Sequence, residues 1–328
     1  MVKYPRREIV KRGVTALGAA LVTRSTVSAQ APAAGVRTAR TPVLDIAYEE
    51  SGAGFPVILL HGFPDDTRAY DGVIGPLVKQ GYRAIVPYLR GYGPTRFRDA
   101  SAPRMAEQAA IGQDVIDLAD ALKIPRFAVA GYDWGGRAAA IAAALRPERV
   151  SAAVLIGGYT IQNVFATPQP APPERERALW YQYYFNTERG RVGLERNRHA
   201  ICRFLWETWS PTWKFTTETY QKTAPSFDNP DFVDVVIHSY RHRIGNAAGE
   251  PRFLEVEKRL ADRPRIDAPT ITLYGAADGL GAPAAQNPGE GATFAKLVAR
   301  RVIEGAGHFM PRERPDAVSG ALLDLLKG

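Results

Sequence analysis

The segment Phe127-Ala-Val-Ala-Gly-Tyr-Asp-Trp-Gly-Gly-Arg-Ala-Ala-Ala140 carries the strongest structural signal in the chain. An apolar run leads into Gly-x-Asp-x-Gly-Gly, and a stretch rich in alanine, the best helix former, follows. Glycines at positions 131, 135 and 136 permit a sharp, strained turn from strand to helix. We therefore predict that Asp133 lies at the N-terminus of a helix, above the end of a strand.

The spacing of this turn matches the Gly-x-Ser-x-Gly nucleophile turn, with aspartate in place of serine. A carboxylate that attacks a saturated carbon forms an ester, which water can cleave at the carbonyl carbon of Asp133 to regenerate the enzyme. The helix N-terminus also favours the ionised carboxylate. The alternative is that Asp133 only caps the helix, since aspartate is a common N-cap residue. The chain contains no Gly-x-Ser-x-Gly turn, which argues against a serine esterase.

On both sides of this turn, short apolar runs alternate with helical stretches. Several runs are continuously apolar, which is typical of parallel strands covered by helices on both faces. The chain of 328 residues, 45% of them hydrophobic, is long enough for a large core. We expect strands at 43–48, 56–60, 84–87, 127–130, 152–156, 270–274 and 301–303, and helices at about 105–122, 134–145, 291–299 and 313–326.

The alternation stops between residues 161 and 262. The proline-rich stretch 168–173 opens this segment, and aromatic-rich helical patterns follow at about 174–187, 191–209 and 230–243. We therefore predict an α/β fold with a mostly parallel central sheet, built from residues 42–160 and 263–328, and a helical cap over 161–262. Inserted helices above the carboxyl ends of strands commonly cover the binding site.

Two polar residues follow the last two expected strands. His308 lies in Gly305-Ala-Gly-His308, and Asp278 follows the strand before it. Both therefore lie at the sheet edge where α/β proteins place their sites, and the order nucleophile, acid, histidine is that of Asp133, Asp278 and His308. We expect His308 to activate water and Asp278 to orient the imidazole. The alternative is that each is an ordinary polar loop residue.

A second loop of interest, His61-Gly-Phe-Pro64, follows the strand at 56–60. In this position the backbone N–H groups of Phe63 and Trp134 are expected to form an oxyanion hole for the Asp133 carboxyl group. The side chain of His61 is interpreted as structural, because one histidine already fills the role of base.

The N-terminus carries most of the net charge of +8. Residues 1–29 contain six basic residues and one acid, which leaves a net charge of +3 for the rest of the chain. The folded part therefore lacks the basic surplus expected of a nucleic-acid-binding protein. The single cysteine, Cys202, excludes an internal disulfide and a thiolate metal cluster.

The same N-terminal segment has the pattern of an export signal. A basic stretch with Arg6-Arg7 precedes the apolar run 14–22, and Val27-Ser-Ala29 offers a cleavage site, as in twin-arginine signals. The apolar run is too short to span a bilayer, so we expect no stable membrane anchor. We predict a cleaved signal over 1–29, a linker over 30–41, and export to the bacterial periplasm or the extracellular space. The alternative is a basic tail on a cytoplasmic protein.

Four motifs together resemble the epoxide hydrolases of the α/β-hydrolase fold: His61-Gly-Phe-Pro-Asp-Asp66, Arg90-Gly-Tyr-Gly93, Gly131-Tyr-Asp-Trp-Gly-Gly136 and Gly305-Ala-Gly-His308. The resemblance covers nearly the whole chain after the expected signal. It implies that an epoxide is converted to a vicinal diol through an ester on Asp133. Haloalkane and fluoroacetate dehalogenases share much of the Asp133 turn, so a dehalogenase with the same nucleophile is the alternative.

The family places two cap tyrosines where they donate hydrogen bonds to the epoxide oxygen. Trp180-Tyr-Gln-Tyr-Tyr-Phe185 resembles the first motif, which implies Tyr181 as donor, with Tyr183 and Tyr184 as rivals. Ser239-Tyr-Arg241 resembles the second, which implies Tyr240. Two phenols suit an opening epoxide, because the developing alkoxide is a poor leaving group that needs a proton. The alternative is that both tyrosines only form the core of the cap.

Two further residues are candidates for substrate binding. Gln182 adjoins Tyr181 in the first cap motif, where the fluoroacetate dehalogenases have a His-Trp pair. Arg137 occupies the second of two positions at which those dehalogenases carry arginines for a substrate carboxylate, while the first is Trp134. Arg137 is expected to favour an acidic substrate or, as the main interpretation, to form a structural ion pair.

The dehalogenase alternative depends on other residues. Phe63 stands where some dehalogenases have an asparagine, but four cap tryptophans leave a halide site open. A catalytically silent binding protein is the third hypothesis, and Asp133, Asp278 and His308 argue against it. The five histidines show no metal-ligand spacing, so we expect no cofactor and no metal, with a small-molecule epoxide and water as the partners.

Overall fold

A computed structural model describes residues 35–167, 169–281 and 291–327. The predicted signal over 1–29 and the first part of the predicted linker lie outside these ranges. Within them, strand β1 (Val36–Arg40) occupies most of the rest of that linker and pairs antiparallel with β2 (Leu44–Ser51). The linker prediction is therefore wrong for residues 36–40, because pairing with a neighbouring strand orders a segment that has little apolar signal of its own.

In the described ranges nine strands form one mixed sheet, in the order β1-β2-β4-β3-β6-β7-β8-β9, with β5 paired to β2. The strands from β4 to β9 along this order pair in parallel, while β1, β2 and β5 pair antiparallel. The remaining bounds are β3 Phe55–Leu60, β4 Tyr82–Pro87, β5 Arg96–Phe97, β6 Phe127–Tyr132, β7 Val150–Ile156, β8 Thr270–Gly275 and β9 Leu297–Ile303. The α/β fold with a mostly parallel sheet is confirmed.

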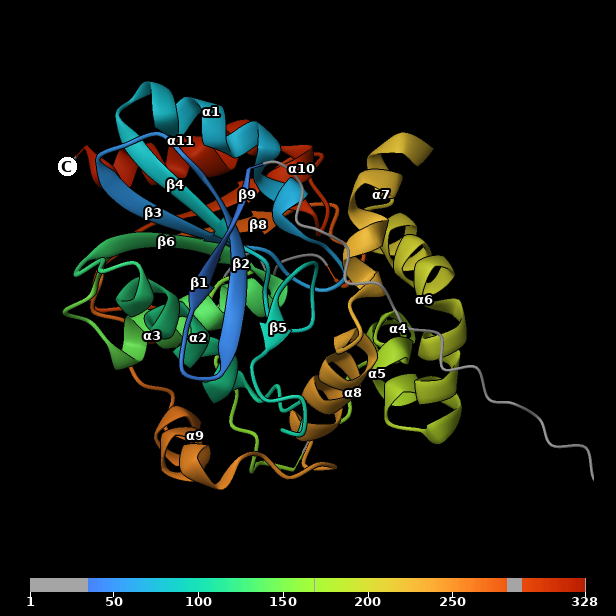
Figure 1. Ribbon diagram of the computed structural model, residues 1–328. Helices are drawn as coiled ribbons and strands as arrows, with labels where there is room; N and C mark the ends of the chain where they lie inside the picture. The colour runs from blue at the N-terminus through green and yellow to red at the C-terminus, as the bar shows by residue number, and fades with distance from the viewer. Residues whose placement is uncertain (1–34, 168, 282–290, 328) are drawn as a thin grey trace, which may run out of the picture. The chain divides into compact units, whose positions relative to one another are not determined.

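Helices cover both faces of the sheet (Figure 1). On one face α1 (Asp71–Lys79) packs against α11 (Pro315–Leu326), next to the short α10 (Met310–Glu313). On the other face α2 (Gln108–Ala121) packs against α3 (Asp133–Leu145). All six residues of β6 between them are buried, which explains its continuously apolar sequence.

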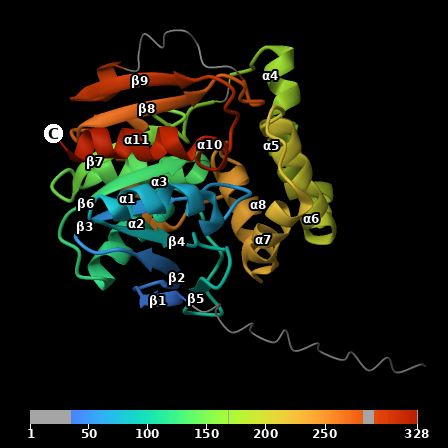
Figure 2. The same cartoon turned by 90° about the horizontal axis from the view of Figure 1, so that it is seen from above.

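The cap is formed by five helices at one end of the sheet, and Figures 1 and 2 agree on this placement. They are α4 Pro173–Ala178, α5 Trp180–Phe185, α6 Glu188–Trp209, α7 Thr217–Thr223 and α8 Phe232–His242. Phe63, which follows β3, contacts the rings of Phe185 and Tyr240 at centroid distances of 5.9 and 5.5 Å. The cap therefore lies over the carboxyl ends of the central parallel strands.

Helix α9 (Leu254–Ala261) packs on α2 of the core, although the sequence analysis assigned it to the cap. Glu257 of α9 accepts hydrogen bonds from the side chain of Gln108 and the backbone of Ala109, each at 2.9 Å. These contacts hold the helix on the core, so the cap helices end at His242 rather than near residue 262.

One predicted helix is wrong. Residues 291–299 were expected to be helical, but the structure has a short 3-10 turn at Gly291–Thr293 and then the strand β9. Alanine, lysine and leucine are good helix formers, but intrinsic propensity is a weak preference, and pairing with β8 along its edge outweighs it. No helix in the described ranges is long and apolar enough to cross a membrane.

Candidate active site

The turn between β6 and α3 holds Asp133 in a left-handed backbone conformation, with φ at +51°. The positions two residues before and after it must be glycine, because a methyl group at Gly131 would lie 2.3 Å from the carbonyl oxygen of Gly135. One at Gly135 would lie 2.2 Å from the carbonyl oxygens of Leu60 and His61. The strained turn therefore needs the close approach of three backbone segments, and it projects the carboxylate beyond the sheet.

The Asp133 carboxylate is held by backbone donors on one side. The N–H of Phe63 donates to Oδ1 at 2.8 Å, and the N–H of Trp134 also donates to the carboxylate. Burial would raise the pKa of Asp133, but the contact with His308 and these two backbone bonds lower it overall. The two N–H groups predicted to form an oxyanion hole thus lie on the carboxyl group itself.

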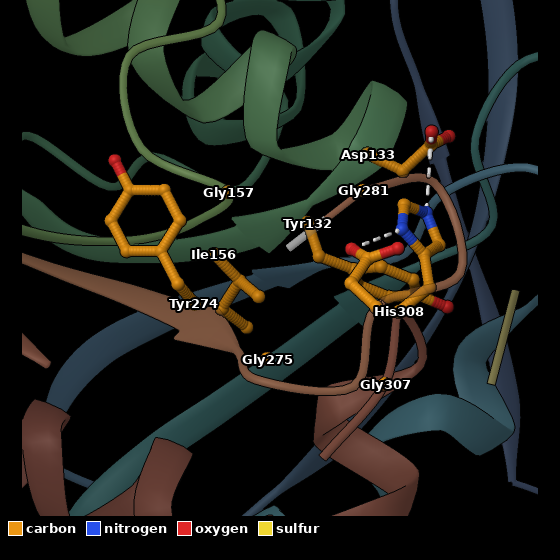
Figure 3. A pocket seen from close by; sticks show the side chains of 10 residues that line it. Tyr132, Asp133, Ile156, Gly157, Tyr274, Gly275, Gly281, Gly307 and His308 are labelled. Carbon is orange, nitrogen blue, oxygen red and sulfur yellow. Dashed lines mark hydrogen bonds and ion pairs between the residues drawn. The ribbon is translucent and has the colours of Figure 1, made fainter. Parts of the chain in front are cut away.

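His308 lies between two carboxylates, and Figure 3 shows it facing Asp133. Its Nε2 is 3.5 Å from Oδ2 of Asp133, and its Nδ1 is 3.1 Å from Oδ2 of Asp278. The three residues come from the ends of β6, β8 and β9, so the parallel sheet brings together positions up to 175 residues apart in the chain, from 133 to 308. Chemically, this arrangement suits a carboxylate nucleophile, a base and a group that orients the base, which are the roles expected of Asp133, His308 and Asp278.

The charge state of His308 depends on both carboxylates. Burial lowers the pKa of His308, but Asp278 and Asp133 outweigh it and raise the pKa to about 10. While both acids are ionised, the imidazole is therefore protonated on both nitrogens and positively charged. If Asp133 becomes an ester, one of the two negative charges is lost, and the pKa of His308 must fall. A lower pKa favours the neutral imidazole, which is the form that can accept a proton.

Two residues that were not among the predicted site residues hold the loop of His308 through hydrogen bonds. Glu313 accepts a hydrogen bond from the N–H of Gly307 at 2.8 Å and another from the hydroxyl of Ser210 at 2.6 Å. That hydroxyl in turn accepts from the N–H of Phe309 at 3.1 Å. Both backbone neighbours of His308 are thus fixed, and Ser210 comes from the cap, which no local motif could reveal.

A small cavity of about 60 Å³ lies beside the two carboxylates and the histidine (Figure 3). Asp133, Asp278 and His308 line it, together with the ring of Tyr274 and the backbone of Gly307. Water takes up roughly 30 Å³ in the liquid, so the space suits one or two water molecules. The cavity therefore offers room for a hydrolytic water within reach of His308.

Tyr181 and Tyr240 lie together above Asp133. Their rings meet edge to face, with centroids 5.3 Å apart, and both are almost completely buried. The hydroxyl of Tyr181 accepts a hydrogen bond from the side chain of Gln182 at 3.1 Å, while that of Tyr240 is buried without a hydrogen-bond partner. Burial and the charge of Asp133 raise the pKa of Tyr181 to about 12, and burial, Tyr181 and Asp133 raise the pKa of Tyr240 well above its usual range. Both phenols therefore remain protonated donors.

The rivals of Tyr181 point elsewhere. Tyr183 is 53% exposed and donates a hydrogen bond to Glu176 on the cap surface. The hydroxyl of Tyr184 lies against the backbone of Gly193 in α6. Of the three tyrosines in the first motif, the structure directs only Tyr181 toward Tyr240.

Trp209, one of the four cap tryptophans, lies beside the triad, although no sequence motif selects it. Its ring lies 5.0 Å from that of His308 and 4.8 Å from that of Tyr181. Its indole N–H is buried without an acceptor. Nothing in the local sequence separates it from Trp206, whose N–H donates to the carbonyl of Pro64 at 2.7 Å.

His61 has the structural role expected of it. The ring is fully buried, its Nε2 accepts from the N–H of Leu89 at 3.0 Å, and its Nδ1 lies 3.1 Å from the carbonyl of Gly62. Burial lowers its pKa to about 4, so the ring is neutral. It ties the loop after β3 to the loop after β4.

Arg137 does not have the ion pair that was its main interpretation. In the described ranges no carboxylate oxygen lies within 4.0 Å of its guanidinium, which instead reaches the side-chain oxygens of Gln108 and Gln162 at 3.1 and 3.4 Å. It also lies 5.0 Å from the ring centroid of Trp134. The same ranges contain no cluster of three or more His, Cys, Asp or Glu side chains suited to a metal ion.

Comparison with known proteins agrees with this geometry. The model of the α/β-hydrolase fold family matches residues 56–315. A crystal structure of a candidate epoxide hydrolase from Klebsiella pneumoniae subsp. pneumoniae has 43% identity and a TM-score of 0.86, covering 89% of this chain and 97% of that one. Epoxide hydrolase A of Mycobacterium tuberculosis is 24% identical over 85% of this chain and 93% of its own length. An epoxide hydrolase of Caballeronia sordidicola is 41% identical over 109 residues, so the match spans about a third of that relative's length.

Proposed function

The chain belongs to the epoxide hydrolases of the α/β-hydrolase fold, and we propose that it converts an epoxide to a vicinal diol through an ester on Asp133. The observation that carries this proposal is the pair of buried cap tyrosines, Tyr181 and Tyr240, whose rings meet edge to face and whose pKa values are both raised by the charge of Asp133. A nucleophile and two proton donors close to one another are what ring opening requires.

In the first step, Oδ2 of Asp133 attacks a ring carbon. Oδ1 accepts a hydrogen bond from the N–H of Phe63, which leaves Oδ2, on the side of His308, as the attacking oxygen. The carbon–oxygen bond of the ring breaks, and its electron pair goes to the epoxide oxygen. That oxygen takes up a proton from Tyr240 or Tyr181, which gives a hydroxyalkyl ester and a tyrosinate. The protonated His308 then gives a proton to the tyrosinate, directly or through water, which leaves a neutral imidazole for the second step.

In the second step, His308 removes a proton from water, and the resulting hydroxide attacks the carbonyl carbon of the ester. The negative charge that develops on Oδ1 is stabilised by the N–H groups of Phe63 and Trp134. The ester bond then breaks, and the hydroxyl proton of the intermediate passes to the leaving oxygen, so that the diol leaves and the water oxygen remains in the carboxylate of Asp133. His308 keeps the proton taken from water, which restores the resting state.

The test uses styrene oxide and the variants Asp133→Asn and His308→Gln. We expect no diol from Asp133→Asn, and from His308→Gln a protein whose mass increases by that of one substrate molecule. In heavy-oxygen water, a single turnover of the wild type should give an unlabelled diol, because the added oxygen comes from Asp133. Label in the first diol, or diol formation by Asp133→Asn, would exclude the ester mechanism.

A second candidate function, a dehalogenase with the same nucleophile, is favoured by one observation. The buried N–H of Trp209 lacks an acceptor beside His308, and a departing halide needs such a donor. Assays of wild type and Trp209→Phe with haloalkanes and haloacetates separate the two. Halide release without diol formation from any epoxide would favour the dehalogenase.

For localisation, we propose export through the N-terminal segment. The support is the sequence pattern alone: paired arginines, a short apolar run and a small-residue cleavage site before residue 30. Expression of the full chain in a bacterium, with Arg6 and Arg7 changed to lysine as the control, tests it. A full-length protein that stays in the cytoplasm would contradict the proposal.

A further inference from the structure

Three consecutive backbone N–H groups of the loop that carries His308 are bound from outside that loop's own strand. The N–H of His308 donates to the carbonyl of Trp209 at 3.2 Å. The N–H of the residue before it donates to the side chain of Glu313 at 2.8 Å, and that of the residue after it donates to the hydroxyl of Ser210 at 3.1 Å. Trp209 and Ser210 are the last residue of α6 and its C-cap. The end of one cap helix and one glutamate therefore hold the backbone on both sides of the base.

The same helix end also holds the loop of Asp278. The N–H of Gly279 donates to the carbonyl of Trp209 at 2.9 Å, so this one oxygen accepts hydrogen bonds from both loops. A methyl group at Gly279 would overlap a carbonyl oxygen of α6, and one at Gly307 would lie 2.5 Å from the hydroxyl of the residue that follows α6. Both loops thus approach the end of α6 as closely as glycine allows, which fixes Asp278 and His308 relative to each other.

Glu313 is a third carboxylate near His308, besides Asp133 and Asp278. Its oxygens accept from the hydroxyl of Ser210 at 2.6 Å and from the N–H of Gly307 at 2.8 Å. In the described ranges no Lys, Arg or His nitrogen lies within 4.0 Å of it. Burial raises the pKa of Glu313, while the two hydrogen bonds and the charge of His308 lower it. Because this attraction is mutual, the carboxylate of Glu313 favours the protonated imidazole.

The position of His308 matters most in the second step of the proposed reaction. In the first step the attacking oxygen belongs to Asp133, which the turn between β6 and α3 holds in place. In the second step Nε2 of His308 must remove a proton from a water molecule that also reaches the ester carbon. The cavity beside Asp133 has a volume of about 60 Å³, so it leaves this water little freedom. A displacement of the imidazole by about 1 Å is therefore expected to slow hydrolysis about 100-fold.

Building on the proposed function, we propose that Glu313 positions His308 for hydrolysis of the ester. It holds the loop directly through the N–H of Gly307 and, through Ser210, on the other side of His308. Its negative charge, together with that of Asp278, stabilises the imidazolium that forms when His308 takes the proton of water. Glu313 itself neither takes up nor releases a proton and acts only through His308, so it is a positioning residue.

The test separates the two steps with styrene oxide, by following the ester on Asp133 by mass in a rapidly quenched single turnover. In Glu313→Ala the ester should decay about 100-fold more slowly, while its formation changes less than about 3-fold. In the steady state kcat and KM should fall together and kcat/KM should stay constant, because this ratio reports the steps up to the ester. Glu313→Gln keeps groups that can bond Gly307 and Ser210, so its ester should decay within about 10-fold of the wild-type rate.

The pH dependence of ester decay tests the charge of Glu313. His308 must be neutral to accept a proton, so the decay rate rises as the pH passes the pKa of His308 in the ester. Glu313→Gln removes a negative charge near the imidazole, so the midpoint of this rise should move to lower pH. The control is Glu304→Gln, four residues before His308, which removes the same charge from an exposed position and should change neither the midpoint nor the rate.

Two results would overturn this role of Glu313. One is equal slowing of ester formation and ester decay in Glu313→Ala, and the other is decay at the wild-type rate in both Glu313 variants. In either case, ester and diol formation by the wild type would leave the proposed function standing. A wild type that forms no ester on Asp133 with any epoxide would instead exclude the proposed function and the role of Glu313 with it.

Discussion

Among single residues, His308 and Tyr240 are polar side chains that the protein buries at the site although burial of such groups costs free energy. His308 lies between two carboxylates that hold a proton on it, and Tyr240 keeps a buried hydroxyl without a partner. In the resting protein the protonated imidazole cannot act as a base, and the hydroxyl of Tyr240 forms no hydrogen bond. In the proposed reaction each group has a role once a substrate is bound. Such groups commonly trade stability for activity.

The pKa of His308 provides the first prediction. Asp133→Asn removes one of the two negative charges beside the imidazole, so the pKa of His308 should fall from about 10 toward its usual value. NMR titration of the imidazole in both proteins measures this change. An unchanged or higher pKa of His308 in Asp133→Asn would show that the charge of Asp133 does not stabilise the protonated imidazole.

The same shift has a consequence for stability. The folded protein binds the proton of His308 more tightly than the unfolded chain, whose histidine has the ordinary value of 6.5. The resulting stabilisation is fully present below about pH 6.5, and it disappears as the pH rises through about 10. In Asp133→Asn this loss should occur at a lower pH, which chemical denaturation across the pH range detects.

Tyr240→Phe provides the second prediction. The change removes a proton donor, so the rate of ester formation with an epoxide should fall about 100- to 10,000-fold. It also removes a buried hydroxyl without a partner, so the unfolding free energy should stay equal or rise by about 1 kcal/mol. Stopped-flow kinetics and urea denaturation measure the two effects. Tyr183→Phe, on the exposed side of the same cap, is the control, and a destabilised Tyr240→Phe would contradict an unpartnered hydroxyl.

At the level of elements, the turn between β6 and α3 is the most constrained part of the structure. It brings the end of β3, the end of β6 and the start of α3 so close together that side chains are excluded at Gly131 and Gly135. Gly136 is less confined, because a methyl group there would meet its nearest atom at 3.2 Å. Gly135 and Gly136 are therefore neighbouring positions in α3 that differ in how closely other atoms approach them, so one can serve as the control for the other.

The third prediction compares Gly135→Ala with Gly136→Ala. Alanine in place of glycine inside a helix normally stabilises it by about 1 kcal/mol. At Gly135 the methyl group would lie 2.2 Å from two carbonyl oxygens, so we expect destabilisation of about 3 kcal/mol and loss of activity. Gly136→Ala should change the unfolding free energy much less. Urea denaturation of both variants tests this, and equal effects would contradict the close approach at Gly135.

Across the molecule, the cap is fastened to the core through the loop after β3. Trp206 of α6 donates to the carbonyl of Pro64, and Thr223 of α7 donates to Asp66 at 3.0 Å. Arg312, in α10 of the core, pairs with Asp65 and also donates to Thr223 at 2.6 Å. One buried arginine thus faces two neighbouring carboxylates at the junction, which leaves an excess of negative charge.

The fourth prediction concerns this excess. Burial and the neighbouring Asp65 raise the pKa of Asp66 to about 7. Because the folded pKa is raised, the folded protein is progressively destabilised relative to the unfolded chain as the pH rises from about 4 to about 7. Asp66→Asn should therefore stabilise the protein at pH 8 by no more than about 4 kcal/mol, and much less near pH 4.

Denaturation at both pH values measures the difference for Asp66→Asn, and asparagine keeps the acceptor that caps the short helix after it. Asp316→Asn, on the exposed surface, is the control. An Asp66→Asn protein that is less stable than the wild type at pH 8 would show that the carboxylate is well compensated by Arg312.

The sequence by itself determined the parallel α/β core, because buried parallel strands must be continuously apolar and helices must alternate with them. It also predicted the turn at Asp133 and the chain positions of Asp278 and His308, since these depend on local spacing and on strand ends. The first strand, the edge strand β9 and the placement of α9 depended on neighbours that no local pattern records. Propensity is weak at such sites, and pairing with an adjacent element decides them.

Only the tertiary structure decided which cap residues face the nucleophile. Tyr181, Tyr183 and Tyr184 occupy one short helix, and only packing against Tyr240 and Trp209 directs the first of them inward. The same holds for the buried N–H of Trp209, which lacks an acceptor. A sequence states which polar groups exist, but whether a buried group is paired depends on distances between segments that the chain brings together only when it folds.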